Sequence, residues 1–157
     1  MSKFEEMLGR AVPVSKYIAS LSSADRPKFE ERGKSYKPKM EVLKSLRKIA
    51  KDFIAVVICS SWCKDCITHT PVLEIIHKRT GLRVEVLGGV KTDPLNPKRL
   101  WAVPPSPPEV DTLKITRIPT ILVYSLDGKE VGRIIEHPQI KPTLEEELLY
   151  IMTRTTS

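Results

Sequence analysis

The chain has 157 residues, of which 41% are hydrophobic and 29% are charged, and this is typical of one globular domain with a sizeable core. No apolar run approaches the roughly 20 residues that a membrane-spanning helix needs, so the sequence predicts no membrane span. The net charge of +7 raises the question of nucleic-acid binding. The Lys and Arg residues alternate with Asp and Glu and form no Arg-rich run, which argues against nucleic acid as a partner and favours a solvated basic surface.

Residues 1–37 are predicted to form a helical extension that packs on the core. Apolar residues recur at helical spacing in two short stripes, and a charged segment with Pro27 near its start favours a further helix. The stripes are Phe4, Met7 and Leu8, followed by Val14, Tyr17, Ile18 and Leu21. Packing on the core is the simplest use of these stripes, and a role in partner binding or dimerisation is the alternative.

Residues 38–157 are predicted to form the main domain, which begins with a helix. A continuous apolar run over 53–59 is typical of a strand that is buried on both faces. A helix is expected over about 63–79, and the alternating pattern of 82–87 indicates a second strand.

The segment 94–108 contains six prolines, which exclude a regular helix across it. A short helix is compatible with 95–102 or with 109–115. Because loops of this length are often functional, the segment is interpreted either as a recognition arm for substrate or as a rigid connection.

The residues after Pro119 are predicted to form a β-hairpin and a final helix. The apolar run 120–124 leads to the turn signal Asp127-Gly128, and a second strand follows. The segment 144–153 is amphipathic with a helical period. The order of these elements predicts an α/β fold in which helices cover both faces of a central mixed β-sheet.

The passage Trp62-Cys63-Lys64-Asp65-Cys66 follows the buried strand and opens a helix. Two thiols separated by two residues can close into a small disulfide ring. The unpaired N–H groups and the partial positive charge of the helix N-terminus favour the thiolate of Cys63. Zinc would need a second ligand pair, and the chain has no second Cys-x-x-Cys, while Cys66 with His69 has no metal motif behind it. The pattern therefore predicts redox chemistry and no metal.

Three motifs in this order resemble the thioredoxin superfamily. They are the Trp-Cys-x-x-Cys at 62–66, Pro71 inside the following helix, and Ile118-Pro119-Thr120 at the start of a strand. The resemblance covers residues 50–150. Within the superfamily, the chain is most similar to a bacterial and archaeal thioredoxin-like branch with an N-terminal extension. It implies the three-layer thioredoxin-like fold and a cis peptide bond before Pro119.

The resemblance implies a thiol–disulfide oxidoreductase that exchanges disulfides with protein substrates and needs no cofactor. Cys63 would attack a substrate disulfide, and Cys66 would resolve the mixed disulfide. The other implied site residues are Trp62, Ile118 and Pro119 for substrate binding and Lys64 and Asp65 for tuning the dithiol. The partners would be protein thiols or disulfides and an upstream reductase or small-molecule thiol. A non-catalytic redox-sensing or partner-binding module is the alternative.

Two positions before the dithiol are unusual. Val57 occupies the place, six residues before Cys63, where thioredoxins often carry a buried Asp that takes the proton of the resolving thiol. That proton must then go to water, to the departing substrate thiolate or to another group of the fold. Cys59 is interpreted as a small apolar filler of the strand, with a third thiol beneath the dithiol as the alternative.

The compartment is predicted from the N-terminal residues and from the number of amide side chains. The N-terminal residues lack the continuous apolar stretch of a secretory signal, which predicts the cytoplasm. Asn96 and Gln139 are the only residues with amide side chains, and depletion of these thermolabile residues is typical of hyperthermophiles. Since those organisms keep disulfides in cytosolic proteins, a thermophilic source fits a cytoplasmic dithiol protein.

Overall fold

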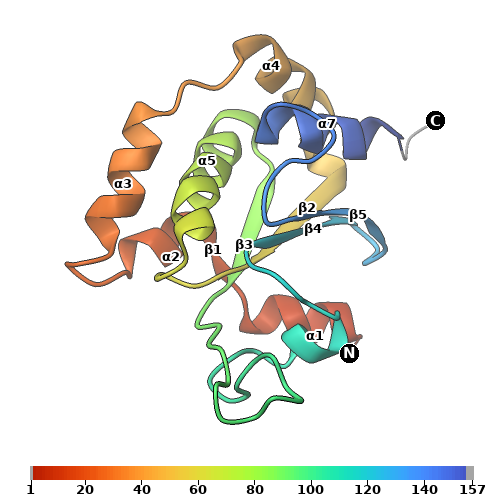
Figure 1. The fold of residues 1–157 in the computed structure, drawn as a ribbon. Helices are drawn as coiled ribbons and strands as arrows, with labels where there is room; N and C mark the ends of the chain where they lie inside the picture. The colour runs from red at the N-terminus through yellow and green to blue at the C-terminus, as the bar shows by residue number, and fades with distance from the viewer. Residues whose placement is uncertain (1, 155–157) are drawn as a thin grey trace.

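The structure, a computed structural model, describes residues 2–154. Its centre is a mixed β-sheet with the strand order β1-β3-β2-β4-β5, and helices cover this sheet (Figure 1). In chain order the elements are α1 (Lys3–Arg10), β1 (Val12–Pro13), α2 (Val14–Ala19), α3 (Arg26–Ser35), α4 (Met40–Ile49), the 3-10 helix η1 (Ala50–Asp52), β2 (Phe53–Ile58), α5 (Lys64–Thr80), β3 (Arg83–Leu87), α6 (Glu109–Thr112), β4 (Thr120–Ser125), β5 (Glu130–Ile135) and α7 (Leu144–Arg154).

The central strand β2 has the continuous apolar sequence that the sequence analysis assigned to a strand buried on both faces. Each of its six residues is buried. β2 pairs in parallel with β3 on one side and antiparallel with β4 on the other. β4 continues antiparallel into β5 through a turn in which Gly128 has a φ of 91°, a left-handed conformation that favours glycine. The predicted α/β fold with a mixed sheet is confirmed.

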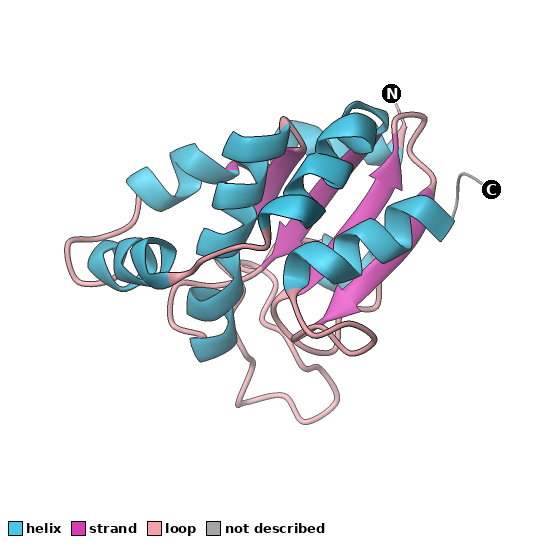
Figure 2. Ribbon diagram, turned by 90° about the horizontal axis from the view of Figure 1, so that it is seen from above, coloured by secondary structure: helices cyan, strands magenta, loops and turns pink. Residues whose placement is uncertain are grey.

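The helices form two layers around this sheet. In Figure 1, α5 and α7 lie above the sheet, whereas α1 and the short teal helix α6 lie below it. The view from above in Figure 2 shows the helices of the upper layer in front of the strands. Helix α5, which carries the dithiol, packs against α3 and α4.

Residues 2–35 contribute to the sheet as well as to the helical layers. The two residues of β1 pair antiparallel with Val86 and Glu85 of β3, a strand that the sequence analysis did not predict. Two residues are too few to show an alternating pattern, so only the neighbouring strand reveals β1. On the face of the sheet that α1 covers, the Phe4 ring lies 4.9 Å from the ring of Tyr124 in β4.

The proline-rich segment forms an ordered loop. It contains no helix over 95–102, and the short helix α6 begins at Glu109, in the second of the two ranges that the prolines allow. The Trp101 indole N–H donates to the carbonyl of Ile115 at 2.6 Å, and the Lys91 N–H donates to the Ser106 hydroxyl at 2.8 Å. The bonds before Pro104 and Pro105 are cis.

Among the described residues, no helix combines the length and the apolar character that a bilayer crossing requires.

Candidate functional site

The two cysteines of the motif lie at the start of α5. Cys63 is the N-cap residue of this helix and is partly exposed, and Cys66 lies in its first turn and is 0% exposed. The three cysteines are free thiols. The backbone N–H of Ser60, just after β2, donates to the Cys66 sulfur at 3.4 Å. One thiol is therefore accessible and the other is held inside the fold.

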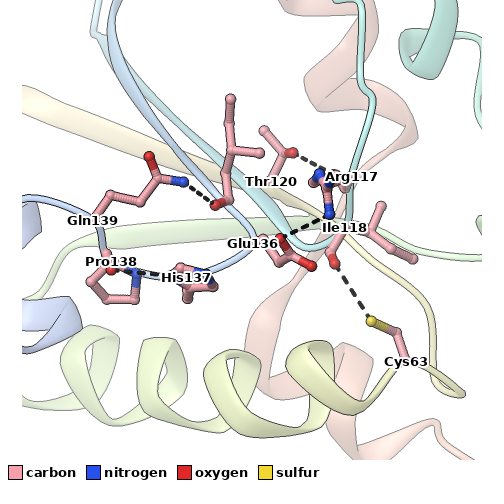
Figure 3. A network of polar contacts seen from close by, with 9 residues as sticks. Cys63, Arg117, Ile118, Thr120, Glu136, His137, Pro138 and Gln139 are labelled. Atoms are coloured by element: carbon pink, nitrogen blue, oxygen red, sulfur yellow. Dashed lines mark hydrogen bonds and ion pairs between the residues drawn. The ribbon is translucent and has the colours of Figure 1, made fainter.

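The loop before β4 brings a backbone carbonyl to Cys63. The Cys63 thiol donates to the Ile118 carbonyl oxygen, with 3.5 Å between sulfur and oxygen, and Figure 3 shows this carbonyl directed at the sulfur. The bond between Ile118 and Pro119 is cis, as the sequence analysis expected. The structure thus brings together two motifs that are 55 residues apart in the chain.

Polar contacts fix the backbone around Pro119 (Figure 3). The Thr120 hydroxyl donates to the Arg117 carbonyl at 2.6 Å, and the Glu136 N–H donates to the Pro119 carbonyl at 2.7 Å. The Arg117 guanidinium forms an ion pair with the Glu136 carboxylate at 3.4 Å. These bonds hold the segment before β4 in one conformation, so the Ile118 carbonyl keeps its position opposite Cys63.

The residues between and before the cysteines face different surroundings. Trp62 is 57% exposed, and its indole N–H donates to the Val90 carbonyl at 3.1 Å, which holds the ring at the rim of the site. Lys64 is exposed, and Asp65 is partly buried in the first turn of α5. The negative charge of the Asp65 carboxylate favours the protonated form of His69, which lies one turn further along α5.

A groove of about 420 Å³ lies next to Trp62. Its lining comes from distant parts of the chain: Tyr17 and Leu21, the segment 60–62, the segment 89–91, and Pro105. The sequence predicts no site role for Tyr17, Val90 or Lys91. No local pattern marks them, because only the packing of α2 and of the loop after β3 places them beside the dithiol.

The third thiol lies directly beneath the dithiol. Cys59 is 0% exposed and lies near Cys66, Tyr17 and Thr70. The hydrogen bond from Cys66 lowers the pKa of Cys59, although burial opposes this shift. Burial raises the pKa of Cys66, and the hydrogen bond to Cys59 raises it further. Cys59 is thus buried, as expected of an apolar filler of the strand, and also lies next to Cys66.

The histidine near the dithiol has no metal-binding surroundings in the described part of the chain. Burial lowers the pKa of His69, and the charge of Asp65 opposes that shift. Between residues 2 and 154, no group of three His, Cys, Asp or Glu side chains is arranged to hold a metal ion.

Comparison with solved structures shows the same fold in two proteins of very different sequence, and a weaker likeness to a third. A protein of unknown function from Pseudomonas aeruginosa is 14% identical, with a TM-score of 0.75, and the match covers 99% of each chain. An HIV epitope scaffold is 14% identical, with a TM-score of 0.67, over 96% of this chain and 88% of its own. The DsbH oxidoreductase is 13% identical, with a TM-score of 0.45, over 76% of this chain and 84% of its own.

No curated protein sequence matches the chain. The profile of a family described as thioredoxin matches residues 11–92, which are just over half of the chain and include β2 and the dithiol. The chain belongs to the thioredoxin family.

Proposed function

We propose that the protein is a thiol–disulfide oxidoreductase that exchanges disulfides with protein substrates through Cys63 and Cys66. One observation carries this proposal. A partly exposed thiol sits at the N-terminus of α5, 3.5 Å from the backbone carbonyl before Pro119, while its partner is buried in the next turn. This arrangement suits a cysteine that attacks from the surface and a second that acts only from inside.

The exchange has two steps. The Cys63 thiolate attacks one sulfur of a substrate disulfide, so a Cys63–substrate disulfide forms and the other substrate sulfur leaves as a thiolate. The Cys66 sulfur then attacks Cys63, which forms the Cys63–Cys66 disulfide and releases the second substrate sulfur as a thiolate. The substrate gains two electrons and the protein loses two. An upstream reductase or a small-molecule thiol restores the dithiol, and we propose the cytoplasm as the compartment.

The proposed substrate side of the site consists of backbone and aromatic surface. An extended substrate segment would align along Ile118 and Pro119, where main-chain hydrogen bonding needs no particular substrate sequence. The exposed face of Trp62 and the adjacent groove would receive the side chains that flank the substrate cysteine. Lys64 and Asp65 would tune the dithiol through charges of opposite sign.

Reduction of insulin by dithiothreitol tests the proposal. The wild-type protein should accelerate the precipitation of reduced insulin chains, and Cys63→Ser should abolish this acceleration. Ser45→Ala, on the exposed face of α4, is the control and should leave the rate unchanged. A redox-sensing module without turnover is the competing function, and it would give no acceleration although the Cys63–Cys66 disulfide still forms and opens.

A further inference from the structure

A second concave site lies on the face of the sheet opposite the dithiol helix. It is a pocket of about 480 Å³ between α1, α6, β4 and the turn that follows β4. In Figure 1, α1 and α6 lie below the sheet, whereas α5 lies above it. The volume falls within the range of about 300–1,000 Å³ that is typical of small-molecule sites. The proposed disulfide exchange uses none of the residues that line this pocket.

Apolar side chains form the walls of the pocket. Met7 and Tyr124 are buried, whereas Phe4 and Leu113 are only partly buried. The centroids of the Phe4 and Tyr124 rings are 4.9 Å apart. The Phe4 ring also lies against the turn, where a Cβ atom on Gly128 would come 3.0 Å from it, so glycine is needed for this approach. A planar ring that enters the pocket would therefore meet aromatic side chains and remove apolar surface from water.

One buried carboxylate at the wall of the pocket is incompletely hydrogen bonded. The side chain of Glu109, at the start of α6, is 6% exposed, and its Oε2 pairs with the guanidinium of Arg10 at the end of α1. Its Oε1 is buried and has no hydrogen-bond partner in the described part of the chain. Both side chains line the pocket. Because an unsatisfied buried oxygen is costly, a ligand that donates to Oε1 supplies a bond that the described chain does not provide.

The charges around the pocket are balanced. Lys3 and Arg10 line it together with Glu6 and Glu109, so basic and acidic side chains are equal in number. Burial raises the pKa of Tyr124 to about 12, so its hydroxyl is uncharged at neutral pH. The guanidinium that already compensates the Glu109 carboxylate would repel a second cation at Oε1. The remaining oxygen therefore favours a neutral donor.

We propose that this pocket binds a small neutral aromatic molecule that carries an N–H or O–H donor. The ring would lie against Phe4 and Leu113, and the donor would bind Oε1 of Glu109. Oε1 is shielded from solvent, but Arg10 beside it is 45% exposed, so a shift of this exposed side chain lets the donor approach. The inference is independent of the proposed function, because the described residues that line the pocket include no thiol.

Titration of the isotope-labelled full chain with indole, followed by amide NMR shifts, tests the proposal. Indole is neutral and has one N–H donor, and a probe of this size should bind with a dissociation constant on the order of 1 mM. The shifts should saturate and be confined to α1, α6 and the turn at Gly128, while the amides of Cys63 and Cys66 keep their positions. Benzofuran has the same two-ring shape without the donor, so it should bind about tenfold more weakly.

Three variants locate the probe. Thr112→Trp places a ring at the pocket from an exposed position of α6 and should abolish the shifts. Thr116→Trp adds the same ring at an exposed position outside the lining, so it should bind indole as the wild-type protein does. Glu109→Leu removes the accepting oxygen and leaves Arg10 to be solvated, so indole and benzofuran should then bind equally. If Glu109→Leu does not fold, the comparison of the two Trp variants still decides where indole binds.

The results that would overturn the proposal are distinct. If indole gives no saturable shifts, or if the shifts persist in Thr112→Trp, the pocket is not a binding site for this class of ligand. If the wild-type protein binds indole and benzofuran equally, the pocket is an apolar cavity that makes no use of Glu109. Cys63→Ser should bind indole as the wild-type protein does although it loses insulin reduction, so a failure of the proposed function leaves this test unaffected.

Discussion

Glu145 on α7 is hydrogen bonded to the connection between α3 and α4, and we expect its substitution by Gln to cost substantial stability. Its side chain is 0% exposed. One carboxylate oxygen accepts from the Tyr36 hydroxyl at 2.6 Å, and the other accepts from the Lys39 backbone N–H at 2.8 Å. These two bonds tie the connection between α3 and α4 to the terminal helix.

The magnitude follows from the two hydrogen bonds. In Glu145→Gln the amide oxygen can still accept from the Lys39 N–H, and the Tyr36 hydroxyl can turn to accept from the amide NH₂. Both bonds then become neutral, and each loses about 1 kcal/mol relative to a charge-assisted bond. The expected loss is about 2 kcal/mol in the free energy of unfolding, which corresponds to roughly 4–8 °C in Tm for a chain of this size.

Urea and thermal unfolding followed by circular dichroism measure this loss. Glu146→Gln is the matched control, because the neighbouring carboxylate is bonded to Lys39 Nζ and Thr143 at the surface and should change stability much less. Burial raises the pKa of Tyr36 and the bond to Glu145 adds to the rise, so the tyrosine should titrate at lower pH in Glu145→Gln. The reasoning is wrong if the two Gln variants have the same stability, or if Glu145→Gln loses less than about 0.5 kcal/mol.

Three further predictions concern the site and its helix. Cys63 should be alkylated by iodoacetamide before Cys59 and Cys66, because it alone of the three thiols is not buried; mass spectrometry of the labelled peptides checks this order. Trp62→Ala should lower kcat/KM for insulin reduction severalfold while costing only about 1 kcal/mol of stability, because the exposed ring forms one hydrogen bond. A variant that loses this stability but keeps the wild-type kcat/KM would contradict a substrate role for Trp62. Burial lowers the pKa of His69, so as the pH falls the unfolded chain takes up a proton at this residue before the folded chain does, and acid destabilises the fold. Urea midpoints should therefore show that His69→Gln loses less stability than the wild-type protein between pH 7.5 and pH 5.

Local sequence determined those elements whose pattern is complete within a few residues. The continuous apolar run of β2 predicts a strand buried on both faces, and every residue of it is buried. The Asp127-Gly128 turn predicts the hairpin, because a left-handed φ is available to Gly128 without steric cost. The prolines of 94–108 exclude a helix there for the equally local reason that each removes a backbone donor.

The sequence also predicts the dithiol and the Ile118-Pro119 segment as parts of the site, although it does not predict that they lie close together. Cys63 and Cys66 are recognisable from spacing and from the helix that follows them, and Pro119 from its place before a strand. That the Ile118 carbonyl lies 3.5 Å from the Cys63 sulfur depends on the antiparallel pairing of β2 with β4. The family resemblance implied this proximity, but no pattern within either segment does.

Only the tertiary structure decided what lies beneath the dithiol and beside it. β1 is too short to show a period, and its pairing with β3 appears only when the chain folds. Tyr17 occupies one apolar position of a short helical stripe, yet its ring lies against Gly88, 71 residues away in the numbering. The physical reason is that hydrophobic periodicity reports which face of an element is buried, whereas the polar atom that a buried side chain meets there is set by the packing of elements distant in sequence.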